Sequence, residues 1–459
     1  MHSWLVPRVV FPVYERVTGR RLWTAVRELR DLQWRSPDEV AARAAGRLRA
    51  LLVHAERHVP YYRRLFENAG FDPHAVRGAE DLARLPVTTK AALRARPPGD
   101  LLADDRPIPR GVAVTTSGAT GFPFEIIGDP ASADETLAAY LFFLEWARAA
   151  LWQTRVDLGV RLGRSFSTAP WLRSRATRAP RRLLLGEDVR SVLGPKVTAE
   201  EFHALVAQIS VRREYFIRAY PAYAADLGAR LVASGLELPA APRVVISCSE
   251  TLTAAREAII KRAFGAPVVN HYSTWEALHL AQSCPDDPAV LHVNPERAVL
   301  WVARADGTPA SPGETGRLLL TALSNYLQPF VNYDIGDRAA LGGRCSCGRG
   351  WPTLLGVEGR TSEVLRTPSG RVISAIALNQ LPRLSNGRAP VWEYQVEQRE
   401  LERVVLRVVP APGFTDTDRH ALREELEACL DDEVTVRLDL VDRIEPDHSG
   451  KRAVIVTHM

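Results

Sequence analysis

Short apolar runs alternate with helical segments through the middle of the chain, and this alternation constrains the fold more than any other feature. Runs typical of buried strands lie at residues 156–160, 244–246 and 267–269. Segments with apolar residues at helical spacing lie between them, at residues 199–211 and 254–264. Strands that alternate with helices of this length usually pack as parallel α/β layers. We therefore expect an α/β fold.

The two ends of the chain differ from this middle region. Residues 1–100 are arginine-rich and predict helices, one of which starts at residue 37. Residues 361–459 predict a small α+β unit. Its expected elements are two strand pairs, 391–396 with 404–409 and 434–440 with 454–457, and a helix at 416–430. We therefore expect two domains, a large one at residues 1–360 with packed α/β subdomains and a small one at residues 361–459.

Composition limits the class of protein. The chain has 459 residues, 46% of them apolar, which is enough for about three domains with sizeable cores. We find no run of about 18 uncharged apolar residues and no signal peptide. Five cysteines, an odd number, do not form a disulfide framework, so we expect a cytoplasmic protein. A net charge of +5 is mild for this length and argues against a dedicated nucleic-acid binder.

Two features of the cationic residues stand out. Eight arginines crowd residues 161–190, which indicates a solvated basic loop or, as a second interpretation, a site for a phosphorylated co-substrate or an anionic surface. Only Lys90, Lys196, Lys261 and Lys451 are lysines among 59 cationic residues. Because an ammonium is a compact charge and a guanidinium a wide fork, a retained lysine suggests a narrow site.

A loop rich in hydroxyl groups and glycine spans residues 115–123 and follows an apolar run at 111–114. Small residues let the backbone approach an anion closely, and the threonine and serine hydroxyls can donate to phosphate oxygens. No Gly-Lys-Ser/Thr closes the loop, so it is not a Walker A loop. The sequence therefore predicts a phosphate-binding loop of another kind, with a plain surface turn as the alternative.

Two further segments place polar side chains after apolar strands. In residues 270–276, Tyr272 can stack on a base, and Glu276 can hold a Mg²⁺ ion that bridges phosphates. In residues 329–337, Asp337 follows a tight glycine turn and can accept hydrogen bonds from both ribose hydroxyls. Taken alone, each segment is equally compatible with a structural strand end or turn.

The motifs together resemble the adenylate-forming superfamily of acyl-CoA ligases and adenylation domains, and specifically its phenylacetate-CoA ligase branch. The resemblance covers nearly the whole chain, with matching motifs in the same order at residues 115–123, 270–276, 333–337, 358–360 and 450–451. The chain departs from the usual motifs at Ala119, Phe122, Ser273, Trp275 and Ser362. The resemblance implies a small C-terminal domain that swings about residues 360–363.

The resemblance assigns roles to individual residues. It implies that Lys451 offsets charge in the transition state of adenylation, with Glu276 and Thr120 also catalytic, and that Glu276 holds Mg²⁺. The implied nucleotide contacts are Thr116, Ser117, Gly118, Gly121, Glu250, Asn270, Tyr272, Asp337 and Arg360. The implied acid pocket contains Tyr140, Phe142, Trp275 and Ala277.

A set of cysteine and histidine residues suggests a second metal. Cys284, His292, Cys345 and Cys347 offer three thiolates and one imidazole, which suits a structural tetrahedral Zn²⁺ ion. Their spacing is not that of a standard zinc finger, but some members of the phenylacetate-CoA ligase branch have a similar set. His279 is a spare candidate ligand.

In the implied reaction a carboxylic acid and Mg-ATP give an acyl-adenylate and pyrophosphate. The resemblance to the phenylacetate-CoA ligase branch implies an aromatic acid. Coenzyme A is the simplest acceptor and gives a thioester. An amine, a hydroxyl or the thiol of a carrier protein is an alternative acceptor, because the motifs specify only the first half-reaction. A non-catalytic nucleotide-binding relative and a role at a membrane surface or scaffold are further alternatives. The branch also suggests a homodimer.

Overall fold

The computed structural model describes residues 6–107, 113–115, 124–150, 152–158, 188–191, 198–360, 364–370, 372–374, 378, 390–430, 432–447 and 452–458. The chain divides into two compact units. The first comprises Met1–Trp152, Leu162–Gly186 and His271–Gly356. The second comprises Gln153–Arg161, Glu187–Asn270 and Val357–Met459. One boundary between the units, after residue 356, lies close to the predicted domain boundary after residue 360.

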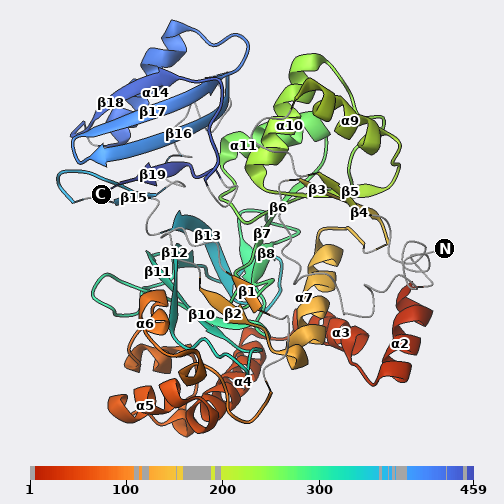
Figure 1. Cartoon of the computed structure of the whole chain (residues 1–459), viewed down its shortest axis with the longest axis vertical. Helices are drawn as coiled ribbons and strands as arrows, with labels where there is room; N and C mark the ends of the chain where they lie inside the picture. The colour runs from red at the N-terminus through yellow and green to blue at the C-terminus, as the bar shows by residue number, and fades with distance from the viewer. Residues whose placement is uncertain are drawn as a thin grey trace. The chain divides into compact units, whose positions relative to one another are not determined.

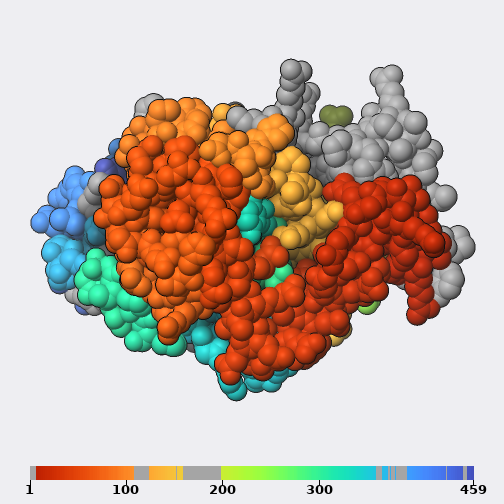
Figure 2. Space-filling view, turned by 90° about the horizontal axis from the view of Figure 1, so that it is seen from below, coloured from red at the N-terminus to blue at the C-terminus, as the bar shows by residue number. Residues whose placement is uncertain are grey.

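The first unit begins with helices, as predicted. They include η1 (Val6–Val10), α2 (Phe11–Thr18), α3 (Leu22–Leu32), α4 (Pro37–His58), α5 (Pro60–Ala69), η2 (Pro73–Ala75), η3 (Ala79–Arg84), α6 (Lys90–Arg94) and η4 (Pro98–Asp100). Helix α4 starts where the sequence predicts, because Ser36 and Glu39 form a reciprocal capping box. Its apolar stripe is buried, and Figure 2 shows these helices, coloured red to orange, over one face of the unit.

The rest of the first unit is built mainly from antiparallel strands. The short strands β1 (Ala113–Thr115) and β2 (Glu125–Ile127) pair with each other. They are followed by η5 (Pro130–Ser132) and α7 (Ala133–Trp146). The larger sheet contains β8 (Ala281–Ser283), β9 (Leu291–Val293), β10 (Ala298–Ala303), β11 (Thr315–Ala322), β12 (Tyr333–Leu341) and β13 (Thr353–Arg360). Their order is β10-β11-β12-β13-β9-β8.

The second unit contains the predicted parallel layer. Strands β3 (Thr154–Leu158), β4 (Asp188–Ser191), β5 (Tyr215–Ala219) and β6 (Val245–Cys248) run parallel in the order β6-β5-β3-β4. Helices α9 (Ala199–Ser210), α10 (Pro221–Ser234) and α11 (Ala254–Phe264) alternate with the strands. Buried apolar side chains from these strands and helices form one core between the sheet and the helices. Strand β7 (Val268–Tyr272) follows α11 and contributes residues to both units.

The C-terminal part of the second unit is the predicted small α+β fold. It consists of the pair β14 (Val364–Arg366) and β15 (Val372–Ser374), strands β16 (Val391–Glu400) and β17 (Arg403–Pro410), helix α14 (Asp416–Cys429), and strands β18 (Thr435–Leu440) and β19 (Ile455–Thr457). Helix α14 packs on one face of the sheet formed by β16–β19, as Figure 1 shows in blue.

One predicted pairing in this region is wrong. Strands β18 and β19 were expected to pair, but they lie at opposite edges of a sheet with the order β18-β17-β16-β19. Strand β18 pairs parallel with β17, and β19 pairs parallel with β16. The reason is that α14 lies between β17 and β18 and supplies the long crossover that a parallel neighbour requires.

Among the described residues, no helix combines the length and the apolar character that crossing a membrane requires.

Candidate functional site

Several of the predicted site residues lie outside the described residues. These are Thr116, Ser117, Gly118, Thr120 and Gly121 of the phosphate loop, Lys451, and residues 361–363 of the predicted hinge. On either side of the loop, β1 and β2 form an antiparallel pair in which Thr115 is opposite Glu125. Arg360 is the last residue of β13.

The predicted adenine and ribose contacts are joined by a hydrogen bond. The hydroxyl of Tyr272, at the end of β7, donates to Oδ2 of Asp337 at 2.5 Å. Asp337 lies on β12 after Gly336, whose positive φ of 78° suits glycine, and the Gly336 amide donates to Asp334 Oδ1 at 2.8 Å. The fold therefore brings together two residues that are 65 positions apart and that the sequence assigned to one nucleotide.

Glu276, the predicted magnesium ligand, is partly buried in the same unit. Its pKa is raised, chiefly by burial and also by the negative charge of Asp337, while Thr274 and Lys90 act in the opposite direction. The hydroxyl of the buried Tyr333 hydrogen-bonds to Glu276, and burial together with this carboxylate raises the pKa of Tyr333. Two carboxylates that repel each other beside a phenol form an oxygen-rich site suited to a divalent cation.

Lys90 is a site residue that the motif comparison missed. It is the first residue of α6, after the N-cap Thr89, and its positive charge lowers the pKa of Glu276. A signal was present in the sequence, because Lys90 is one of only four lysines in this arginine-rich chain. No motif connected it to Glu276, since the two residues lie far apart in the sequence.

Two predicted nucleotide contacts belong to the second unit. Asn270 lies on β7 and is partly buried. Glu250 accepts hydrogen bonds from the backbone amides of Ala222 (3.3 Å) and Arg452 (2.9 Å). The preceding Ser249 has a φ of 68°, an uncommon conformation for a residue other than glycine. Glu250 is thus held by groups of the protein itself, and its role toward a nucleotide stays a prediction.

The predicted acid-pocket residues fall into two environments. Tyr140 and Trp275 are partly buried, and the Tyr140 ring lies 5.2 Å from the ring of His279. Phe142, in contrast, is only 1% exposed and packs against Trp146 and Trp351, each at 5.2 Å between ring centroids. Phe142 therefore contributes to an aromatic core. Ala277 is also buried and lies in the turn after β7.

A histidine of β7 and one of the turn after it form an ordered pair. Gln282 donates from Nε2 to the carbonyl of Phe143 at 2.7 Å, so its Oε1 faces His271 Nδ1 at 3.0 Å. Nδ1 of His271 must therefore carry a proton, and in the neutral imidazole its Nε2 accepts from His279 Nδ1 at 3.0 Å. Leu278 and His279 have φ values of 50° and 48°, a conformation that is costly outside glycine and recurs at functional sites.

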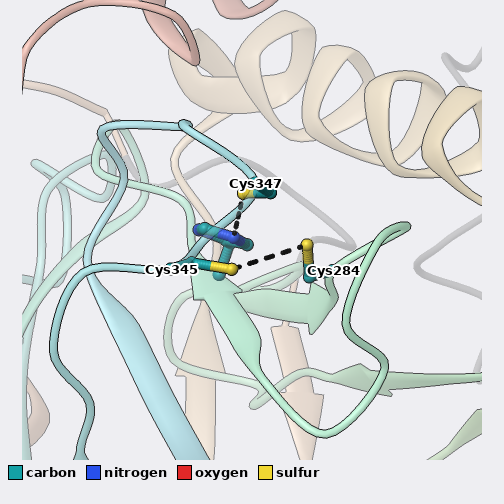
Figure 3. A group of neighbouring side chains, drawn as sticks. Cys284, Cys345 and Cys347 are labelled. Carbon is teal, nitrogen blue, oxygen red and sulfur yellow. Dashed lines mark hydrogen bonds between the residues drawn. The ribbon is translucent and has the colours of Figure 1, made fainter.

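The predicted zinc ligands come together. The donor atoms of Cys284, His292, Cys345 and Cys347 all lie within 4.8 Å of one another. Cys345 Sγ lies 3.8 Å from Cys284 Sγ, and Cys347 Sγ lies 3.3 Å from His292 Nε2; Figure 3 shows the three cysteines around one point. His279, the spare candidate, is not in this group but bonds to His271.

The pKa shifts of His292 and Cys347 favour metal binding, whereas that of Cys284 opposes the thiolate form that a metal requires. Burial lowers the pKa of His292, which favours the neutral imidazole that binds metals. Burial raises the pKa of Cys284 to about 11, whereas hydrogen bonds from Arg349 and the neighbouring cysteines outweigh burial at Cys347 and lower its pKa. Three sulfur donors and one nitrogen donor fit a tetrahedral Zn²⁺ ion.

Comparison with known proteins supports the sequence analysis. Residues 365–458 match the family described as the CapK C-terminal domain. The chain is 26% identical over 404 residues to a phenylacetate-coenzyme A ligase of Thermus thermophilus, covering 85% of this chain and 86% of that protein. It is 28% identical over 340 residues to a phenylacetate-coenzyme A ligase of Escherichia coli, covering 68% and 70% respectively.

The fold is that of a solved ligase. A structure of 2-hydroxyisobutyryl-CoA ligase in the postadenylation state, in complex with R3-HIB-AMP, superposes with a TM-score of 0.73. The two chains are 20% identical, and the match covers 93% of this chain and 91% of the other. The predicted α/β fold and the predicted resemblance to the adenylate-forming superfamily are confirmed.

Proposed function

Because this chain is a relative of phenylacetate-CoA ligases and has the fold of the adenylate-forming superfamily, we propose that it is an AMP-forming acid–CoA ligase. The acid carboxylate attacks the α-phosphorus of ATP, and the bond to pyrophosphate breaks to leave an acyl-adenylate. The sulfur of coenzyme A then attacks the acyl carbon, the thiol proton passes to solvent, and AMP leaves. The observation that carries the proposal is the hydrogen bond between Tyr272 and Asp337 beside the carboxylate of Glu276.

The residues of the chain bind and orient the nucleotide in this proposal. Asn270 and the ring of Tyr272 contact the adenine, while Asp337 accepts hydrogen bonds from the ribose. Thr116, Ser117, Gly118, Thr120 and Gly121 bind the phosphates, with Glu250 and Arg360 as further nucleotide contacts. Lys451 offsets the negative charge that develops at the α-phosphate, a kind of contact whose loss costs about 10²- to 10³-fold in rate.

Mg²⁺ fits the carboxylate of Glu276. The pKa of this carboxyl is raised by burial and by the nearby charge of Asp337, both of which a bound cation would counteract. When bound, the ion would neutralise phosphate charge. The chain's own contribution is to keep this carboxylate in place through Tyr333 and to balance it with Lys90.

The substrate and the domain motion are the finer parts of the proposal. The names of the two relatives support an aromatic acid, which Tyr140 and Trp275 would contact, with Phe142 and Ala277 behind them. A small domain at residues 361–459 is supported by the family match, which starts at residue 365, and its movement about residues 360–363 stays a prediction. A homodimer, a carrier protein as the alternative thiol donor and a cytoplasmic location stay predictions.

A structural Zn²⁺ ion held by Cys284, His292, Cys345 and Cys347 completes the proposal. The four donor atoms lie within 4.8 Å of one another, and their sulfur and nitrogen chemistry is that of closed zinc sites. The ion would connect the segment after β8, strand β9 and the turn between β12 and β13. Its role is stability, because all four positions are taken by protein ligands.

The test is acid-dependent release of pyrophosphate from Mg-ATP, measured across aryl and aliphatic acids with and without coenzyme A. We expect release with an aryl acid, and a thioester only when coenzyme A is present. Release without a thioester would indicate another acceptor. No release with any acid, in protein that still binds ATP, would refute the proposed enzyme and favour a non-catalytic nucleotide-binding relative.

A pair of lysine variants adds a matched control. Lys451→Ala should lose acyl-adenylate formation by about 10²- to 10³-fold with an unchanged fold. Lys261→Ala should remain fully active, because Lys261 forms an exposed i,i+4 pair with Glu257 on α11. Full activity of the Lys451 variant would contradict its assignment.

A further inference from the structure

A second group of potential metal ligands lies in the first unit and contains no cysteine. His54 and His58 are on α4, and Asp105 follows η4. One potential ligand atom from each residue lies within 4.8 Å of the others. We propose that His54, His58 and Asp105 bind a divalent first-row transition metal ion, with water completing its coordination.

The helix places the two imidazoles side by side. Residues four positions apart lie on the same face of an α-helix, and the ring centroids of His54 and His58 are 4.9 Å apart. Their side chains are 12% and 34% exposed, so an ion can reach them from solvent while one side of the site is walled by protein. Two histidines with this spacing on one helix supply two of the protein ligands in known metal sites.

The hydrogen bonds of His54 orient it as a ligand. Its Nε2 lies 2.8 Å from the carbonyl oxygen of Tyr326, and since a carbonyl only accepts, this nitrogen carries the proton. The lone pair therefore lies on Nδ1, which is 4.0 Å from Asp105 Oδ2. A ring nitrogen that donates to a backbone carbonyl while the other faces the ion is the arrangement found around metal-bound histidines.

The local charge also favours a cation. Asp104 brings a second carboxylate within 3.0 Å of His58 Nδ1. Arg106 lies 3.0 Å from Asp105 and competes for it, but it also pairs with the buried Asp129 at 2.9 Å. Three carboxylates and one guanidinium leave a net negative charge with neutral imidazoles, which a divalent ion balances. Arg106 can stay with Asp129 when Asp105 turns to the ion.

The proposed ion would join segments that backbone hydrogen bonds already hold side by side. Asp104 donates its backbone amide to the carbonyl of His58 at 3.0 Å, and Ala103 donates to the carbonyl of Leu327 at 2.8 Å. Nitrogen and oxygen donors of this kind suit Zn²⁺, Ni²⁺ and Co²⁺. Ligands held by backbone contacts need only small side-chain movements to reach bonding distance.

The experiment titrates chelator-treated, full-length protein with Co²⁺ and measures both bound metal and absorption. Thiolate ligands give Co²⁺ a charge-transfer absorption that nitrogen and oxygen ligands do not, so the cysteine site and the proposed site are distinguishable. With excess Mg²⁺ present to occupy the Glu276 site, we expect two Co²⁺ ions per chain, of which one binds without added thiolate absorption. The absence of such an ion in the wild-type protein would overturn the proposal.

Variants identify the ligands. His58→Ala, or Asp105→Asn should the first variant fail to fold, should weaken the ion without thiolate absorption by at least about 10-fold and leave the thiolate band unchanged. His74→Ala is the matched control, because His74 is exposed on η2 and outside the group. Unchanged affinity in a folded His58 or Asp105 variant would overturn the assignment.

Discussion

Tyr272 donates a hydrogen bond to Asp337 across 2.5 Å, so the residue proposed to stack on adenine also orients the residue proposed to bind ribose. The two side chains come from β7 and β12 of the first unit. A hydrogen bond to a carboxylate is among the stronger ones in proteins. Nucleotide binding should therefore depend on both residues together.

Replacement of Asp337 tests this dependence. Asp337→Asn should raise the KM for ATP by about 10- to 150-fold, since a hydrogen bond to a charged group contributes about 1.5–3 kcal/mol. Tyr272→Phe, which keeps the ring, should have a smaller effect in the same direction, and the two effects should not add. The KM for ATP in the pyrophosphate-release assay is the measurement. Additive effects would show that the two residues act independently.

The ionised carboxylate of Glu276 should be required for activity but should lower the stability of the folded protein. Its pKa is raised by burial, so the folded state holds this proton more tightly than the unfolded state does. Between the ordinary glutamate pKa and this raised pKa, the free energy of unfolding falls as the pH rises, by about 1.4 kcal/mol for each pH unit. Without Mg-ATP, Glu276→Gln should therefore raise the Tm at neutral pH while it abolishes Mg-dependent adenylation.

The control for this variant is Glu314→Gln. Glu314 is a partly exposed carboxylate in an ion pair with Arg304. Its loss should leave activity unchanged and should not raise the Tm at neutral pH. In the wild-type enzyme, activity should fall with decreasing pH through the raised pKa, because the proposed metal ligand must be ionised. A lower Tm at neutral pH in the Glu276 variant would contradict this account.

Loss of one thiolate should release the proposed zinc ion. Cys347→Ser should lower zinc affinity by at least about 10-fold and lower the Tm, because a structural ion contributes its binding free energy to folding. Cys429→Ser is the control, since Cys429 lies on α14 outside the group. Zinc content by elemental analysis and thermal unfolding are the measurements. Purified wild-type protein with less than stoichiometric zinc would refute the site.

The elements that the sequence predicted well are those that depend on local patterns. Helix α11 has its predicted bounds, because Thr253 caps its start and Gly265 ends it. The pairing of β18 and β19 was predicted wrongly because strand neighbours are set by a crossover helix and not by proximity in sequence. Local patterns thus determine where an element lies but not which element lies beside it.

The same distinction applies to the site. Tyr272 and Asp337 were predicted from motif order, and the fold joins them by a hydrogen bond. The four predicted zinc ligands were chosen by residue type, and the fold brings their donor atoms together. Lys90 was missed because its charge acts on Glu276, which lies in a distant segment, and His271 was missed because its contact with His279 depends on the turn between them. The aromatic residues of α7 could not be sorted from spacing alone, because Tyr140 and Phe142 lie two positions apart yet Phe142 is fully buried and Tyr140 is not.

A buried ion network in the second unit gives the last prediction. The guanidinium of Arg452 contacts Asp226 at 2.6 Å and Glu393 at 3.0 Å, and Arg256 contacts Glu393 at 2.9 Å. The Arg452 side chain is 3% exposed and that of Glu393 is 7% exposed. Arg452→Ala should lower the free energy of unfolding by about 3–5 kcal/mol, because it removes one of the two guanidinium partners of the buried Glu393 carboxylate and the partner of Asp226.

An exposed pair in the same small sheet provides the matched control. Arg437→Ala should change the free energy of unfolding by less than about 1 kcal/mol, since Arg437 is 71% exposed and pairs with Asp439 at the surface. Urea unfolding at constant m-value is the measurement for both variants. A double change, Arg452→Met with Glu393→Met, should cost less than the sum of the two single changes, because both single changes remove the same contact. A cost equal to the sum of the two single changes would mean that the pair does not interact.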